Sequence, residues 1–134
     1  MQVLRPETVR FDDQPWEGVE SIVIERSPAR EILEFGDLGM QAALVDAPEQ
    51  RVTISVSASA DRAWSEPVSP GAAGELEFVS SFGRTDSNRR RVTVSCVVWR
   101  VREQWGVSGA VRTLTLLGVS PDGGASDPVT VEEL

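Results

Sequence analysis

Hydrophobic and polar residues alternate with a period of two over much of the chain. In residues 51–58 the even positions are Val, Ile, Val and Ala, whereas the odd positions are Arg, Thr, Ser and Ser. This alternation is typical of an antiparallel strand with one face on the core and one face in solvent. Similar patterns predict further strands at 19–26, 30–35, 75–82, 91–101, 110–119 and 129–131.

The segments between these strands predict turns and very little helix. Ser27-Pro28-Ala29 is expected to turn the chain between the strands 19–26 and 30–35, and 83–90 is expected to form the polar tip of a long hairpin. Residues 61–66 fit one helical turn, and 39–46 fit either a short helix or a strand. We therefore predict a mainly β fold: an antiparallel β-sandwich or barrel with at most one short helix.

The whole chain is expected to form one domain, 1–134, with an N-terminal arm at 1–8 and a C-terminal arm at 120–134. Within it, the strand 91–101 departs from simple alternation, because its second face becomes apolar at Val97, Trp99 and Val101. Either this strand crosses the centre of the fold beneath a loop or helix, or its second face meets a neighbouring subunit. Trp16, Trp64, Trp99 and Trp105 leave the same choice open between core packing and interface anchoring.

Composition removes most kinds of catalysis. The 134 residues include no His, Tyr or Lys, so all thirteen basic residues are Arg. Serine or cysteine catalysis with a His base, His metal ligands, Schiff-base chemistry and a P-loop Lys are thereby excluded. The single Cys96 fits a small buried side chain and forms no disulfide within the chain.

Paired carboxylates are the remaining catalytic possibility. The candidates are Asp12 with Asp13, Glu31 with Glu34, and Glu75 with Glu77. Because no aromatic platform for a sugar accompanies them, we expect no enzymatic activity and no cofactor. The segment 122–127 resembles a calcium loop only loosely, so a turn is favoured and no metal site is expected.

No apolar stretch is long enough to span a bilayer, and the first residues lack the apolar block of a secretory signal. Synthesis in the cytoplasm and no membrane insertion are therefore expected.

Charge is unevenly distributed along the chain, whose net charge is −8. Residues 1–50 hold four Arg against eleven acidic residues, and residues 51–100 hold seven Arg against five acidic residues. The basic excess comes largely from Arg84 and Arg89-Arg90-Arg91 at the predicted hairpin tip. This loop either remains solvated or pairs with the acidic first third of another copy. Specific nucleic-acid binding is disfavoured by the net charge, but an acidic surface suits a protein past which DNA slides.

Several segments together resemble the tail tube family of tailed bacteriophages. The resemblance is a general pattern over most of the chain and includes no diagnostic motif. Its carriers are the acidic opening 9–22, the segments 34–39 and 46–52, Pro70-Gly71 with Glu75-Leu76, and the closing stretches 120–123 and 127–129.

The resemblance implies a β-sandwich or barrel-like protomer flanked by a helix and assembled into hexameric rings. Such rings stack into a hollow tube with an acidic inner wall, through which the genome passes into the host. It further implies other tail proteins as partners, viral DNA in the lumen without specific binding, a place in the virion tail, and assembly in the host cytoplasm. Unlike many members of the family, this sequence has no clear long helix.

Two sets of site residues follow as hypotheses. The expected contacts between subunits are Arg84, Arg89, Arg90, Arg91 and Trp99. The expected lumen-facing acids are Glu17, Glu20, Asp37, Glu75 and Glu77. The alternative roles are a tail terminator, a connector or baseplate subunit, or a β-sandwich binding module that does not polymerise.

Overall fold

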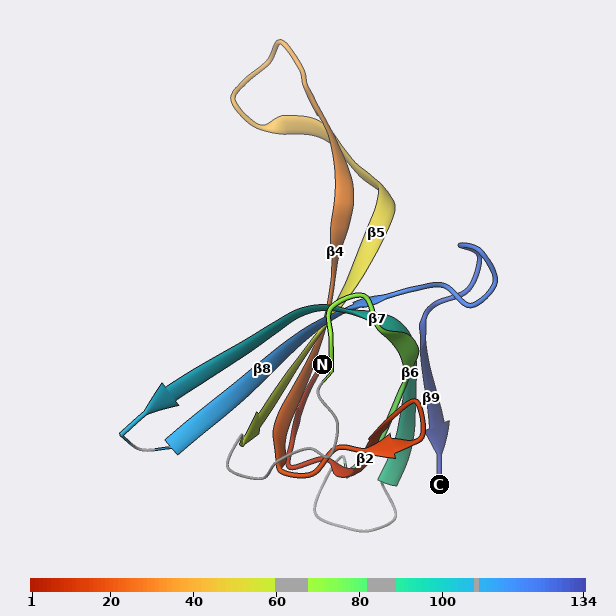
Figure 1. Ribbon diagram of the computed structural model, residues 1–134. Helices are drawn as coiled ribbons and strands as arrows, with labels where there is room; N and C mark the ends of the chain where they lie inside the picture. Colours follow the sequence, from red (N-terminus) through yellow and green to blue (C-terminus); the bar gives the residue numbers. More distant parts are fainter. Residues whose placement is uncertain (60–67, 82–88, 108) are drawn as a thin grey trace.

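The computed structural model describes residues 1–134 except 60–67, 82–88 and 108. All the regular elements of these residues are β-strands, which form a single nine-stranded antiparallel sheet without any helix (Figure 1). The mainly β prediction is confirmed. The sheet curls around its own inner face but does not close into a barrel.

The sheet combines short terminal strands with two long hairpins. In chain order the strands are β1 (Gln2–Leu4), β2 (Glu7–Phe11), β3 (Gln14–Pro15), β4 (Val19–Phe35), β5 (Ala42–Ser59), β6 (Ala73–Ser81), β7 (Arg89–Gly106), β8 (Gly109–Gly118) and β9 (Val129–Glu133). Their spatial order is β1-β4-β5-β8-β7-β6-β2-β3, and β9 pairs with β7. The segments expected as terminal arms thus hold β1, which pairs with β4, and β9.

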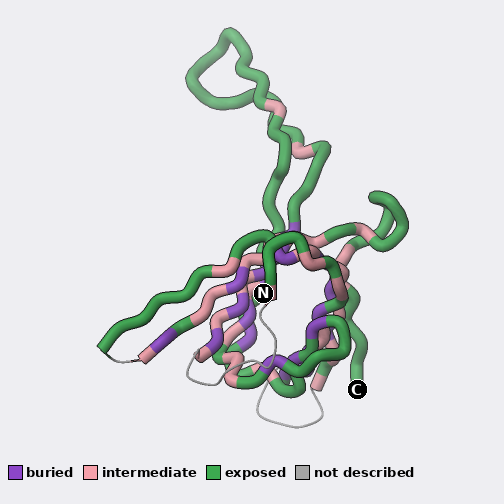
Figure 2. The backbone as a smooth tube through the Cα atoms, viewed as in Figure 1, coloured by how far each residue is buried: buried purple, intermediate pink, exposed green. Residues whose placement is uncertain are grey.

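The buried residues of the hydrophobic core lie on the strands that form the curl (Figure 2). The even-numbered residues of 52–58 are all buried, as the alternation predicts, and the strands opposite contribute Phe78, Leu76 and Leu114, none of which is exposed. At one end of the core the ring of Trp16 stacks on that of Phe11, with 5.0 Å between their centroids. Trp16 is therefore a core residue.

The turn predicted at Ser27-Pro28-Ala29 is wrong. β4 runs through these residues as one strand, with Ser27 opposite Arg51 and Pro28 opposite Gln50. Pro is tolerated there because no described strand pairs with the outer edge of β4 at Pro28, where a missing N–H breaks no ladder. The pairing shifts on either side of Arg30, which absorbs the irregularity. The predicted strands 19–26 and 30–35 are thus two halves of β4.

Other predictions differ in detail. Of the two possibilities for 39–46, the structure shows a strand, because β5 begins at Ala42. The helical turn expected at 61–66 and most of the hairpin tip expected at 83–90 lie outside the described residues. The predicted strands 75–82, 91–101, 110–119 and 129–131 correspond to β6, β7, β8 and β9.

A β-bulge explains the apolar second face of β7. Val98 lies opposite Leu116 and Arg100 opposite Thr115, so Trp99 is the extra residue of the bulge. Beyond it, Val101 takes up the core-facing position opposite Leu114. The Trp99 side chain is 61% exposed, so no described part of the chain covers it.

Candidate functional site

The most conspicuous surface feature is the outer half of the β4–β5 hairpin. We call residues 27–50 the arm; they project from the curled sheet (Figure 1). β4 and β5 pair there with each other alone among the described strands. Figure 2 shows the arm as exposed along almost its whole length, and none of its residues is buried.

Large apolar side chains lie on the arm in solvent. Leu38 and Met40 at its tip are more than 90% exposed, and Phe35 is 62% exposed. The other exposed apolar side chains are Leu33, Leu44 and Val45. Contiguous exposed apolar surface is unusual for a monomer and marks interaction sites.

The charge of the arm is strongly acidic. Its one basic residue, Arg30, lies 3.9 Å from Glu49. The remaining acidic residues are Glu31, Glu34, Asp37 and Asp46. The arm is therefore an apolar surface set among carboxylates.

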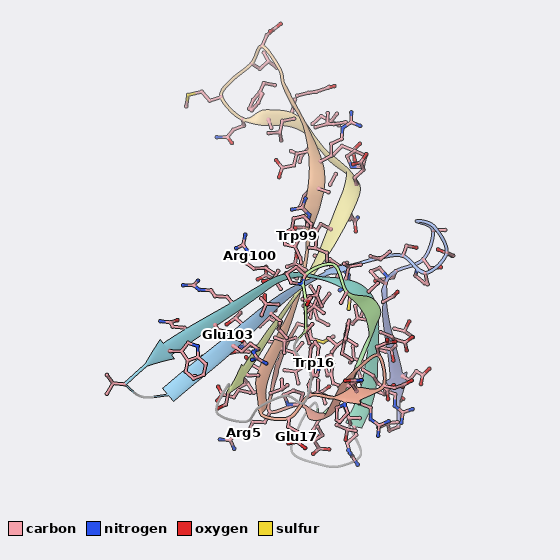
Figure 3. The ribbon with its side chains drawn as sticks, in the orientation of Figure 1. Arg5, Trp16, Glu17, Trp99, Arg100 and Glu103 are labelled. Atoms are coloured by element: carbon pink, nitrogen blue, oxygen red, sulfur yellow. The ribbon has the colours of Figure 1, made fainter. Side chains whose placement is uncertain are left out.

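The β7–β8 hairpin forms a second projection, which we call the ribbon and define as residues 99–113 (Figure 1). Trp105 is 71% exposed near its tip, and Val107 is fully exposed at the turn. Trp99 lies at its base beside Arg100 (Figure 3). The ribbon thus presents aromatic and apolar groups, as the arm presents aliphatic ones.

The ribbon has the opposite charge from the arm. Arg112 donates to Glu103 across the two strands, with 2.7 Å between Nη2 and Oε1. Arg100 and Arg102 have no carboxylate partner within the described part of the chain. Their side chains lie on the face opposite to that of Glu103 and Arg112, because successive strand residues alternate. One face of the ribbon therefore carries two unpaired cations.

Both projections leave backbone hydrogen-bonding groups without a strand neighbour. β6 pairs with β7 as far as Val97, so from Trp99 onward one edge of β7 faces no other described strand. β1 covers β4 at residues 21–23, and the outer edge of the arm beyond has no described strand beside it. Bare edges of this kind favour pairing with another chain.

The predicted inter-subunit arginines are held by carboxylates of their own chain. Arg89 donates to Glu7 of β2 at 2.7 Å. Arg90 lies 3.7 Å from Glu133 of β9, and Arg91 lies 3.3 Å from Glu77 of β6. These pairs connect β7 to β2, β9 and β6, and all six side chains remain partly exposed. Arg84 lies outside the described residues, and the role of all four Arg in contacts between subunits stays a prediction.

The predicted lumen acids do not form one cluster. Asp37 lies at the tip of the arm, and Glu75 and Glu77 lie on β6 in the body of the sheet. Glu17 and Glu20 lie at the start of β4, near Arg5, whose N–H donates to the carbonyl of Glu20 (Figure 3). Only Glu75 and Glu77 come together in space, beside Asp12 and Asp13 in a shallow depression.

The candidate carboxylate pairs have structural explanations. Asp12 and Asp13 form the two-residue turn between β2 and β3, with φ values of 51° and 64°. Two positive φ values are the signature of a hairpin turn whose twist matches the strands. Glu31 and Glu34 belong to the exposed arm. Nowhere in the described chain do three or more His, Cys, Asp or Glu side chains lie placed to hold a metal ion.

The loop between β8 and β9 contains an ordered network around Asp122. Its carboxylate accepts hydrogen bonds from the Ser120 hydroxyl at 2.8 Å and from the Ser126 N–H at 2.8 Å, and also from the Ser126 hydroxyl. The Ser126 hydroxyl contributes most to lowering the pKa of Asp122 to about 2. The network makes this loop a defined structure, and its residues form turns and bends as predicted for 122–127.

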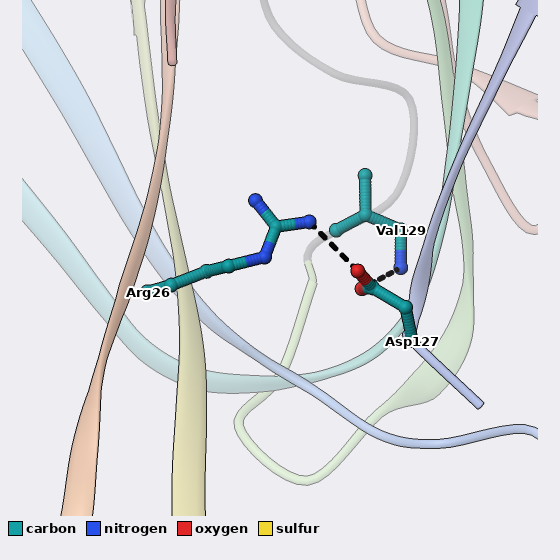
Figure 4. Close-up of polar contacts among 3 residues, drawn as sticks. All are labelled: Arg26, Asp127 and Val129. Carbon is teal, nitrogen blue, oxygen red and sulfur yellow. Dashed lines mark hydrogen bonds and ion pairs between the residues drawn. The ribbon is translucent and has the colours of Figure 1, made fainter. Parts of the chain in front are cut away.

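Asp127 connects the same loop to the base of the arm (Figure 4). Its carboxylate accepts from the Val129 N–H at 2.9 Å and from Arg26 of β4 at 2.9 Å. The bond from Val129 is the main cause that holds the pKa of Asp127 below its ordinary value. The contact fixes the start of β9 against the strand from which the arm projects.

Sequence reasoning identified Trp99 as a surface candidate but missed the arm. The sequence predicts a strand at 30–35 and either a short helix or a strand at 39–46, because alternation cannot distinguish a strand that covers a core from one that projects beyond it. The available signal was the dense mixture of acidic and apolar residues on both strands of one hairpin.

Comparison with models of known protein families finds no match to this chain, and comparison with curated protein sequences finds none either. The described residues contain no helix that is long and apolar enough to cross a membrane.

Proposed function

We propose that this protein is a structural, non-enzymatic subunit of a bacteriophage tail, which assembles with copies of itself into hexameric rings that stack as the tail tube. The observation that carries the proposal is the arm: an exposed, apolar, two-stranded projection with bare edges. An isolated two-stranded hairpin is marginally stable in water. A partner that covers it would give a reason for its length and its exposed side chains.

The body of the molecule supports the same role. A curled sheet with its core on the inside provides a rigid base from which two hairpins project in different directions (Figure 1). Two unlike surfaces on one chain suit a heterologous contact, which generates a closed ring or an open filament. The general resemblance of the sequence to tail tube proteins selects rings and tubes among these assemblies.

If DNA passes through the proposed tube, the inner wall must not bind it. A wall with excess negative charge repels the phosphate backbone and prevents sticking. The acids assigned to this wall are Glu17, Glu20, Glu75 and Glu77, whereas Asp37 lies at the tip of the arm and is assigned to the contact between copies. A reconstruction of the tube in which these side chains lie away from the lumen, or in which the wall is neutral or basic, would overturn this part.

The proposal is tested by concentrating the purified full-length chain and following its mass by sedimentation velocity, with negative-stain microscopy of the same samples. We expect rings of six subunits and stacked tubes. Rings that never stack would fit a terminator or connector instead. A monodisperse monomer throughout the concentration series would contradict self-assembly and favour a binding module.

A further inference from the structure

Two exposed surfaces of the same chain complement each other in charge and in apolar character. The arm holds one Arg against five acidic residues, whereas the ribbon holds three Arg against one acidic residue. We infer that the arm of one copy docks on the ribbon of a second copy, an inference that rests on the proposed self-assembly. The contact is heterologous, so every copy offers one arm and one ribbon.

Electrostatics determines which copies and which surfaces meet. Two arms repel each other because both are acidic, and two ribbons repel each other because Arg100 and Arg102 of each have no carboxylate partner in the described chain. An arm facing a ribbon places Glu34, Asp37 and Asp46 near those two guanidinium groups. Like pairings are thereby selected against, and only the arm–ribbon pairing joins opposite charges.

Apolar contact supplies the second part of the interface. Trp99, which lies beside Arg100 at the base of the ribbon, is 61% exposed, and Trp is a residue type that anchors protein interfaces. Phe35, Leu38 and Met40 offer the arm side chains of matching character. Covering these groups removes exposed apolar side chains of both projections from water.

The test exchanges charges between the two surfaces. The arm variant carries Glu34→Arg, Asp37→Arg and Asp46→Arg, and the ribbon variant carries Arg100→Glu and Arg102→Glu. None of these five side chains takes part in an ion pair within the described chain. Circular dichroism and thermal unfolding verify that each variant folds.

Each variant alone is expected to assemble at a concentration about tenfold or more above that of the native chain, because its arm and ribbon now carry the same sign. A one-to-one mixture of the two variants is expected to co-assemble, since each arm finds a ribbon of opposite charge. A chain with all five substitutions is expected to assemble by itself, which also excludes general damage by the substitutions. The matched control, Arg5→Glu with Arg10→Glu, changes the charge as much as the ribbon variant does and is expected to assemble like the native chain.

The outcomes separate this inference from the proposed function. If the native chain assembles but the mixture and the five-fold variant do not, the arm–ribbon contact is wrong and self-assembly stands. If either single-surface variant assembles like the native chain, the contact is wrong as well. If the native chain remains a monomer at every concentration, the proposed function and this inference fail together.

Tryptophan fluorescence gives a second readout of the same contact. In the monomer, Trp99 and Trp105 are open to acrylamide, whereas Trp16 is buried at 6% exposure. Assembly is expected to reduce quenching in the native chain. The reduction should disappear in the Trp99→Phe, Trp105→Phe variant. An unchanged quenching profile in assembled native protein would show that the ribbon remains in solvent and would overturn the inference.

Discussion

At the scale of single residues, the local backbone geometry accounts for several unusual residues of this chain. Asp12 and Asp13 fill a turn that requires positive φ, a conformation that Asp tolerates better than most residues. Trp99 reaches solvent because it is the extra residue of a bulge. Gly118 ends β8 at a point where other segments approach too closely for a side chain. Each position is explained by local geometry, and each leads to a substitution with a definite expected result.

Gly118→Ala is expected to destabilise the fold by about 1–3 kcal/mol, the usual range for overpacking. A methyl group there would lie 2.9 Å from Val52 Cβ and 2.9 Å from Pro128 Cγ, so β5 or the chain before β9 must move. The control is Gly39→Ala in the turn of the arm, where a Cβ meets nothing within 4 Å. Urea denaturation of both variants measures the difference, and equal stabilities would show that the sheet adapts freely around Gly118.

Ser126→Ala is expected to raise the pKa of Asp122 from about 2 toward its ordinary value of 3.8. The hydroxyl of Ser126 is the largest of the contributions that favour the charged carboxylate, so its removal shifts the balance. Titration of the Asp122 carboxyl carbon by NMR measures the midpoint. Ser55→Ala, a substitution on β5 away from this loop, serves as the control. An unchanged midpoint in Ser126→Ala would show that the remaining donors suffice.

At the scale of elements, the sequence predicted the strands far better than their lengths and connections. The pattern at 52–58 identified the core face of β5, because one face of that segment is buried and the other is not. The same reasoning divided β4 at Pro28, since Pro ordinarily marks a turn. The strand can continue through Pro28 because no described strand pairs with that edge there. The sequence did not predict the arm for a related reason. Its apolar residues look like core residues unless one knows that no other described layer covers them. That absence is a property of the folded sheet and of no local segment.

The arm is expected to be dispensable for folding. Replacing residues 27–51 by Asn-Gly would join Arg26 directly to Val52, its partner in the β4–β5 pairing, through a two-residue hairpin turn. No residue of the replaced segment is buried, so the core remains complete and the unfolding midpoint should stay close to that of the native chain. Thermal unfolding followed by circular dichroism checks this expectation.

Leu114→Ala is the matched comparison, because the Leu114 side chain is fully buried and its truncation should cost about 2–5 kcal/mol. If removing the arm destabilised the fold as much as Leu114→Ala does, the arm would have to be an integral part of the monomer. The Arg26–Asp127 pair lies just inside the new turn and should survive.

At the scale of the whole molecule, the residues that stabilise the fold and the residues that are exposed for contacts lie in different parts of the sheet. The core lies inside the curl and accounts for the folded body, whereas the two projections carry most of the exposed apolar side chains. The absence of His, Tyr and Lys, which first excluded classes of enzyme, has a second consequence here. Apart from the single Cys96, it removes the side chains whose ordinary pKa values lie between about 6.5 and 10.4. The charges of arm and ribbon should therefore be constant across the neutral range.

The free energy of unfolding is accordingly expected to show a broad plateau between about pH 5 and pH 9. Below it, stability falls because Asp122 and Asp127 have pKa values lower than their unfolded value of 3.8. Their contribution is complete above that value and is lost as the pH falls through the folded values, which for Asp122 is about 2. Above the plateau, stability falls because burial raises the pKa of the Cys96 thiol from 9.0 to about 11. The Glu75 carboxylate raises this pKa further, and a backbone hydrogen bond with Leu76 partly offsets the rise. The unfolded chain then ionises its thiol before the folded chain does. Urea denaturation at constant ionic strength from pH 2 to pH 11 measures the profile, and Cys96→Ala should keep the acid limb while losing the alkaline one. A steep slope between pH 6 and pH 8 would contradict this account, because no side chain of the sequence has its ordinary pKa in that range.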